Sequence, residues 1–144
     1  MTNERFVRWQ GQTISQLSTA LALFSGLSVA GLGFLFSLVH ETSFKPTGVV
    51  AALYLLAILS LFIGTIAGST AVVTRLLDFR LTAKKTINTS YEPLTLFGAN
   101  ATTLGKATWV SFWVLLISFT IGILLSSLVI GSIYLSDIFC SIGT

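Results

Sequence analysis

The sequence predicts an all-α integral membrane protein with three transmembrane helices. Of its 144 residues, 53% are hydrophobic and only 9% are charged, whereas about a quarter of the residues of a soluble domain are charged. The apolar residues form three uncharged runs, at 17–39, 48–73 and 109–135, and each is long enough to cross a hydrocarbon core of about 30 Å. Basic residues gather beside these runs, where they set orientation. We therefore predict one membrane domain, 1–144.

The first predicted helix is preceded by a polar N-terminal arm, residues 1–16. One interpretation of this arm is an amphipathic helix on the membrane surface, with Trp9 at headgroup depth. A helical lead-in to the span is favoured, because the apolar face of the arm is weak. Residues 17–39 are too long an apolar run for a signal-peptide core of about 7–15 residues. Small residues recur here at every fourth position and predict close packing against another helix: Ser18, Ala22, Gly26 and Ala30.

The second predicted helix extends beyond its span. After the external loop 40–47, the uncharged run 48–73 continues without a proline into TRLLDFRLTAKK. One helix over 48–85 would be about 57 Å long at 1.5 Å per residue. That length exceeds the bilayer core, so we predict a basic cytoplasmic stalk after the span. The span repeats the four-residue spacing of small residues, and it includes a GxxxG motif that favours close helix contact: Ser60, Gly64 and Gly68.

Residues 74–108 are predicted as the cytoplasmic stalk followed by an irregular loop, which Pro93, Gly98 and Gly105 interrupt. The third span, 109–135, has tryptophans at its start and a tyrosine at its end, which is typical of residues at the two membrane interfaces. An external tail, 136–144, completes the chain. The third set of small residues at four-residue spacing is Ser118, Gly122 and Ser126.

The distribution of charge predicts the orientation. Positive segments alternate with nearly neutral ones at each crossing, so the positive-inside rule places the N-terminus inside and the C-terminus outside. We expect a multi-pass protein of the cell membrane, most simply the bacterial inner membrane. Cys140 is the only cysteine. Outside the membrane it would meet oxidising conditions, where it could cross-link two copies, although a buried or lipid-facing thiol is the simpler interpretation.

The composition argues against catalysis and against coupled transport. One histidine, one cysteine and five scattered acids suit neither a metal site nor an acid–base pair, so we expect no enzyme activity and no cofactor. The three runs carry no charge, whereas pumps and coupled transporters usually place acids or bases within the membrane. The net charge of +3 lies beside the spans, so it does not indicate nucleic-acid binding.

Two functions agree with this pattern. The favoured one is association between helices, with the chain as a homo-oligomeric or partner-binding structural or regulatory subunit in the lipid bilayer. Its partner would be a second copy or a larger membrane or cytoplasmic protein. The alternative is a homo-oligomeric channel with a path lined by Thr65 and Ser69 and a basic mouth at Arg75 and Arg80. The cytoplasmic basic surface predicted for docking comprises Arg75, Arg80, Lys84 and Lys85.

Overall fold

The computed structural model describes residues 2–41, 44–87 and 101–142, with side chains described within 11–41, 44–80 and 102–134. These residues form three helices, α1 (Thr2–Leu38), α2 (Val49–Ile87) and α3 (Ala101–Ile142), and none of them lies in a strand. Each helix contains a segment long and apolar enough to cross a membrane: Gly11–Leu38, Val49–Arg80 and Thr102–Tyr134. The predicted all-helical class with three apolar spans is confirmed, and it indicates a small membrane protein.

The helices extend beyond the predicted spans. Residues of the N-terminal arm and the first apolar run belong to the single helix α1. α2 runs without a break through the basic segment to Ile87. α3 begins at Ala101 and continues to Ile142, so the end of the predicted loop and most of the predicted tail are helical. Gly105 lies inside α3 and does not interrupt it, because a helical glycine costs only about 1 kcal/mol and the neighbouring Thr108 is buried.

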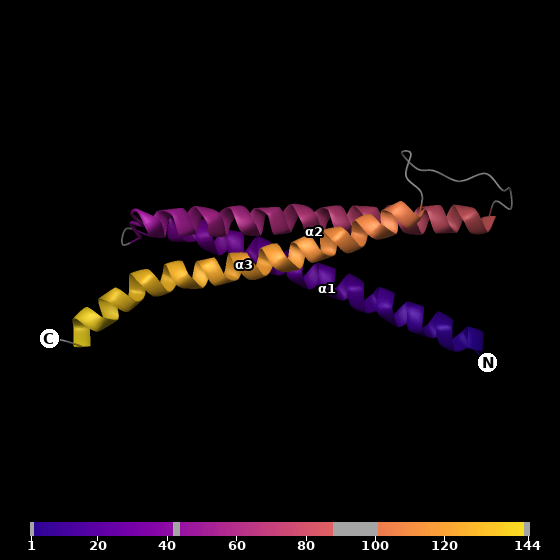
Figure 1. Ribbon diagram of the computed structural model, residues 1–144, viewed down its shortest axis with the longest axis horizontal. Coiled ribbons are helices and arrows are strands. Elements are labelled where there is room, and N and C mark those ends of the chain that lie inside the picture. Colours follow the sequence, from indigo (N-terminus) through magenta and orange to yellow (C-terminus); the bar gives the residue numbers. More distant parts are fainter. Residues whose placement is uncertain (1, 42–43, 88–100, 143–144) are drawn as a thin grey trace.

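The three helices are in contact along only parts of their lengths. In Figure 1, α2 is nearly straight, while the N-terminal half of α1 and the C-terminal half of α3 diverge from it toward opposite ends. α2 packs far more extensively against α3 than against α1. The buried apolar residues form two clusters. The larger comprises Leu35, Leu38, Phe44, Tyr54, Ala57, Leu61 and Val129, and the smaller comprises Leu21, Ala67, Ala71 and Leu115.

Tyr54 of α2 stabilises the turn between α1 and α2. The Tyr54 hydroxyl donates a 2.7 Å hydrogen bond to the carbonyl of Leu35. This carbonyl is one of the last four of α1, which have no hydrogen-bond donor within the helix itself. The Phe44 ring meets the Tyr54 ring edge to face, with centroids 5.1 Å apart. Gly48 has φ +55°, a left-handed conformation that glycine adopts without steric cost. α2 begins at the next residue.

Replacing this buried hydroxyl is expected to weaken the fold. Tyr54→Phe keeps the ring but leaves the Leu35 carbonyl without its 2.7 Å donor, so we expect the free energy of unfolding to fall by about 0.5–1.5 kcal/mol. Reversible unfolding of the purified protein in mixed micelles measures this change. Tyr134→Phe is the control, because the Tyr134 hydroxyl lies 3.3 Å from Glu41 Oε2 at an exposed position. Equal stabilities of the two variants would contradict the role of Tyr54.

Candidate functional site

Leu61 of α2 packs against both of the other helices. This side chain is fully buried. A Cβ placed on Gly31 of α1 would lie 3.1 Å from Leu61 Cδ1, and one placed on Gly122 of α3 would lie 2.7 Å from Leu61 Cγ and Cδ2. Leu61 therefore fills the space that two glycines leave on the neighbouring helices. The four-residue patterns included Gly122 but neither Leu61 nor Gly31.

The small residues predicted on α2 lie in this interface. Gly64 and Gly68 are buried. A Cβ on Gly64 would lie 3.4 Å from Ser28 Oγ of α1 and 3.6 Å from Ser118 Cβ of α3. A Cβ on Gly68 would collide with Ser25 Oγ of α1. That oxygen is buried and has no hydrogen-bond partner within the described part of the chain. Sequence reasoning did not single out either α1 serine.

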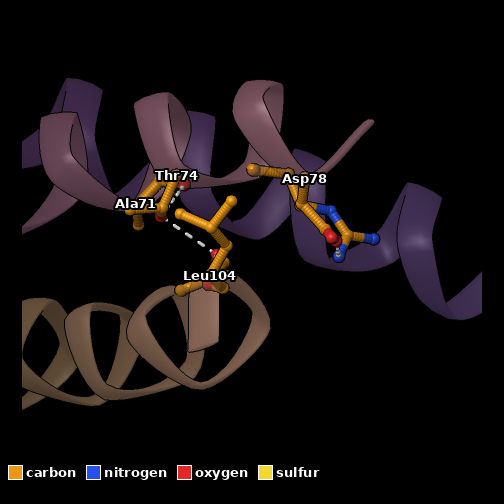
Figure 2. A network of polar contacts seen from close by, with 6 residues as sticks. Ala71, Thr74, Asp78 and Leu104 are labelled. Atoms are coloured by element: carbon orange, nitrogen blue, oxygen red, sulfur yellow. Dashed lines mark hydrogen bonds and ion pairs between the residues drawn. The ribbon is translucent and has the colours of Figure 1, made fainter. Parts of the chain in front are cut away.

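Hydroxyl groups link α2 to α3. Ser60 Oγ donates a 2.8 Å hydrogen bond to the Ser118 carbonyl, which joins two of the predicted packing residues across the interface. Thr74 Oγ1 of α2 lies 3.0 Å from Thr108 Oγ1 of α3. Figure 2 shows Thr74 facing the start of α3. Ser126 is buried, and its hydroxyl donates a 2.7 Å bond to the Gly122 carbonyl of its own helix, so it packs without an exposed polar atom.

The small residues predicted on α1 have a different position. All four are exposed within the chain, and a Cβ on Gly26 would meet nothing within 4 Å. α1 packs against its neighbours through another face, which includes Leu21, Ser28 and Leu35. The chain therefore brings together the small residues of α2 and α3 and leaves those of α1 on its outer surface. We call this outer row the α1 stripe: Ser18, Ala22, Gly26 and Ala30.

The candidate pore residues lie along α2. Thr65 is half-buried and Ser69 is exposed. Each hydroxyl donates a 3.0 Å hydrogen bond to a carbonyl one turn earlier in α2, at Leu61 and Thr65 respectively. Since a hydroxyl oxygen also has two acceptor lone pairs, both residues can still present an acceptor to a neighbour.

The basic residues begin at the end of the apolar part of α2. Arg75 forms the ion pair with Asp78 that their i, i+3 spacing allows, with 3.8 Å between Nη1 and Oδ2, and Figure 2 shows Asp78 one turn beyond Thr74. The Arg75 guanidinium also lies over the Phe79 ring, 4.9 Å from its centroid. Arg80 is exposed. The side chains of Lys84 and Lys85 lie outside the described residues, although their backbone belongs to α2.

A groove lies between α1 and α2 at this end of the bundle. Its volume is about 530 Å³, within the usual range of about 300–1,000 Å³ for small-ligand sites. Ser18 and Ala22 of the α1 stripe form part of one wall, and Val72 and Arg75 form part of the other. The groove exists because the N-terminal half of α1 diverges from α2 (Figure 1). Nothing in the residue spacing predicted it, since it depends on the angle between the helices.

Comparisons with protein-family models, with curated proteins and with solved structures find no match for this chain. The functional argument therefore rests on the geometry of its own residues.

Proposed function

We propose that this chain is a small membrane protein that associates with itself through α1 and serves as a homo-oligomeric structural or regulatory subunit. The observation that supports this proposal is the outward position of the α1 stripe. The equivalent small residues of α2 and α3 pack inside the chain, whereas Ser18, Ala22, Gly26 and Ala30 are exposed. No catalytic role is part of this proposal.

The physical reason concerns how helices associate in lipid. Lipid tails are as apolar as leucine, so close backbone packing, rather than removal of apolar surface from water, holds membrane helices together. A row of small residues permits such an approach. The same row on two copies is self-complementary about a two-fold axis. A second copy of α1 therefore supplies a matching surface without any other part of the chain.

Depth markers support the proposed span and stalk, and the basic residues after Thr74 support its orientation. The contact between Thr74 and Thr108 brings Arg75 and Trp109 to a common level, and Trp109 is exposed. From there to Tyr134, α3 covers about 38 Å at 1.5 Å per residue, close to the about 40–45 Å of a bilayer with its headgroups. We place the Arg75 end in the cytoplasm, so that the rest of α2 forms the basic stalk and the C-terminus lies outside the cell membrane.

The test is the mass of the purified full-length protein in lipid nanodiscs, together with variants of the α1 stripe. The wild type is expected to be a dimer or a larger homo-oligomer. Gly26→Ile and Ala30→Ile place branched side chains where close approach is needed, so both are expected to shift the protein to monomer. Gly105→Ile is the matched control, because a Cβ on Gly105 also meets nothing within 4 Å but lies on α3.

Two results of this measurement would contradict self-association through α1. One is a monomeric wild type. The other is an oligomer whose mass does not change in Gly26→Ile or Ala30→Ile. A second protein that co-purifies at a fixed ratio, and is lost in these variants but not in the control, would assign the α1 stripe to that partner instead.

A channel is the second candidate, and the position of Thr65 and Ser69 favours it. Ser69 is exposed and Thr65 is half-buried, so neighbouring copies of α2 arranged around an axis would have hydroxyl oxygens available to line a path. The basic end of α2 would then form its mouth. A ring of four or more copies that conducts ions in liposomes would support this candidate, whereas a dimer provides no central axis for a pore.

A further inference from the structure

We propose that the groove between α1 and α2 binds one phospholipid, with an acyl chain between the two helices and the phosphate at Arg75. This inference goes beyond self-association, because the groove is formed within a single chain. A lipid there would cover the Ser18 and Ala22 end of the α1 stripe and leave Gly26 and Ala30 for a second copy. The residues that carry the inference are the apolar walls of the groove and the Arg75 guanidinium between them.

The apolar walls fit a hydrocarbon chain. α1 and α2 separate toward the N-terminus of α1 (Figure 1), and the space between them is about 530 Å³. Both walls belong to segments apolar enough to cross a membrane. The end of the groove at Val72 lies on the bilayer side of Arg75 and faces lipid rather than water, so a lipid tail can fill it. Its apolar lining includes Leu17, Leu21, Val72, Leu76 and Phe79.

The polar side chains of the groove fit a phosphate. Arg75 lines the groove, and its guanidinium is held beside Phe79 and Asp78. The separation of 3.8 Å from Asp78 Oδ2 is too long for a hydrogen bond, and arginine has five N–H donors that suit a bidentate phosphate contact. Ser15 and Ser18 line the same groove and add hydroxyl donors.

The depth of the groove suits a lipid headgroup. Arg75 adjoins Thr74, which contacts Thr108, and the next residue of α3 is the exposed Trp109. Tryptophan is enriched at the level of the headgroups. The guanidinium therefore lies where phosphates are concentrated, with Val72 one turn closer to the bilayer centre and Leu76 and Phe79 on the cytoplasmic side. Basic pockets between membrane helices are typical binding sites for lipid headgroups.

A second copy of the chain is a poorer occupant of this groove. A helix seated against Arg75 would bury its charge unless it supplied an acid. Among the described side chains the only acids are Asp78, already beside Arg75, and Glu41, which lies in the turn at the other end of the helical pair. A phosphate supplies the required negative charge, and an acyl chain supplies the apolar surface.

The test uses native mass spectrometry of the full-length protein titrated with palmitoyl-oleoyl phosphatidylglycerol. We expect one tightly held lipid per chain in the wild type. Arg75→Gln is expected to weaken this binding at least about tenfold, because a contact with a charged donor is lost. Arg80→Gln removes the same charge from an exposed position outside the groove and is expected to change the affinity less than twofold.

A second pair of variants tests the acyl chain. Val72→Phe fills the groove and is expected to displace the lipid, whereas Val73→Phe adds the same bulk at an exposed neighbour that does not line it. Glycerol phosphate, which has no acyl chain, is expected not to bind. The proposal is overturned if the wild type holds no lipid, if each variant matches its control, or if glycerol phosphate binds as tightly as the phospholipid.

Discussion

Replacing Gly122 with alanine is expected to lower the free energy of unfolding by about 1–3 kcal/mol, the usual cost of adding an atom to a well-packed interface. The added Cβ would lie 2.7 Å from Leu61 Cγ and Cδ2 and 3.4 Å from the Leu61 backbone nitrogen. The contact with the backbone nitrogen is an ordinary van der Waals distance, but the two contacts at 2.7 Å require that the fully buried Leu61 side chain change its rotamer or that α2 and α3 move apart. Reversible unfolding in mixed micelles, followed by circular dichroism, measures the loss.

Gly105→Ala is the matched control for this variant. It lies on the same helix, and a Cβ there meets nothing within 4 Å. Because alanine favours a helix over glycine by about 1 kcal/mol, this control is expected to be neutral or slightly stabilising. If both variants unfolded alike, close packing at Gly122 would not contribute to stability.

Leu61→Ala is expected to cost about 2 kcal/mol, at the low end of the usual range for a buried leucine. The reason is that lipid is as apolar as the protein interior, so the transfer contribution nearly vanishes and lost packing remains. Leu61 is fully buried. Leu55→Ala is the control, since Leu55 lies on the same helix with 65% of its surface exposed. We expect Leu55→Ala to leave the stability almost unchanged.

The double variant shows whether the two residues act on each other. Alanine at position 61 removes Cγ and Cδ2, the atoms that a Cβ at position 122 would meet at 2.7 Å. Leu61→Ala with Gly122→Ala should therefore be destabilised by at least about 1 kcal/mol less than the sum of the single variants, which is a coupling of the size found between residues in contact. Additive effects would rule out direct packing of Leu61 against Gly122.

The helices and the small-residue faces of α2 and α3 could be predicted from sequence because they depend on local patterns. Long uncharged runs predict spans, and the spacing of Gly64, Gly68 and Gly122 predicts faces that allow close approach. The ion pair between Arg75 and Asp78 follows from their i, i+3 separation. Span length, the spacing of small residues and the separation of Arg75 from Asp78 are all distances along one helix, and the regular geometry of an α-helix determines them.

What the sequence could not predict depends on how one helix lies against another. Leu61 resembles every other leucine of α2, and only the positions of Gly31 and Gly122 identify it as a contact with both of the other helices. The α1 stripe has the same spacing as the others but faces outward, since spacing identifies a face without naming its partner. Tyr54 did offer a signal, because a hydroxyl inside an apolar run needs a partner.

The unequal attachment of α1 has a mechanical consequence. Its buried contacts run from the turn, where Leu35 accepts the Tyr54 hydrogen bond, to Leu21, which lies in a cluster with Ala67 and Ala71, whereas its other end diverges (Figure 1). From Leu21 back to Thr2 the helix is about 29 Å long at 1.5 Å per residue. A helix held at one end acts as a lever, so a tilt of about 5° at Leu21 moves the far end by about 2.5 Å. Small changes in packing at Leu21 are therefore magnified at the N-terminus.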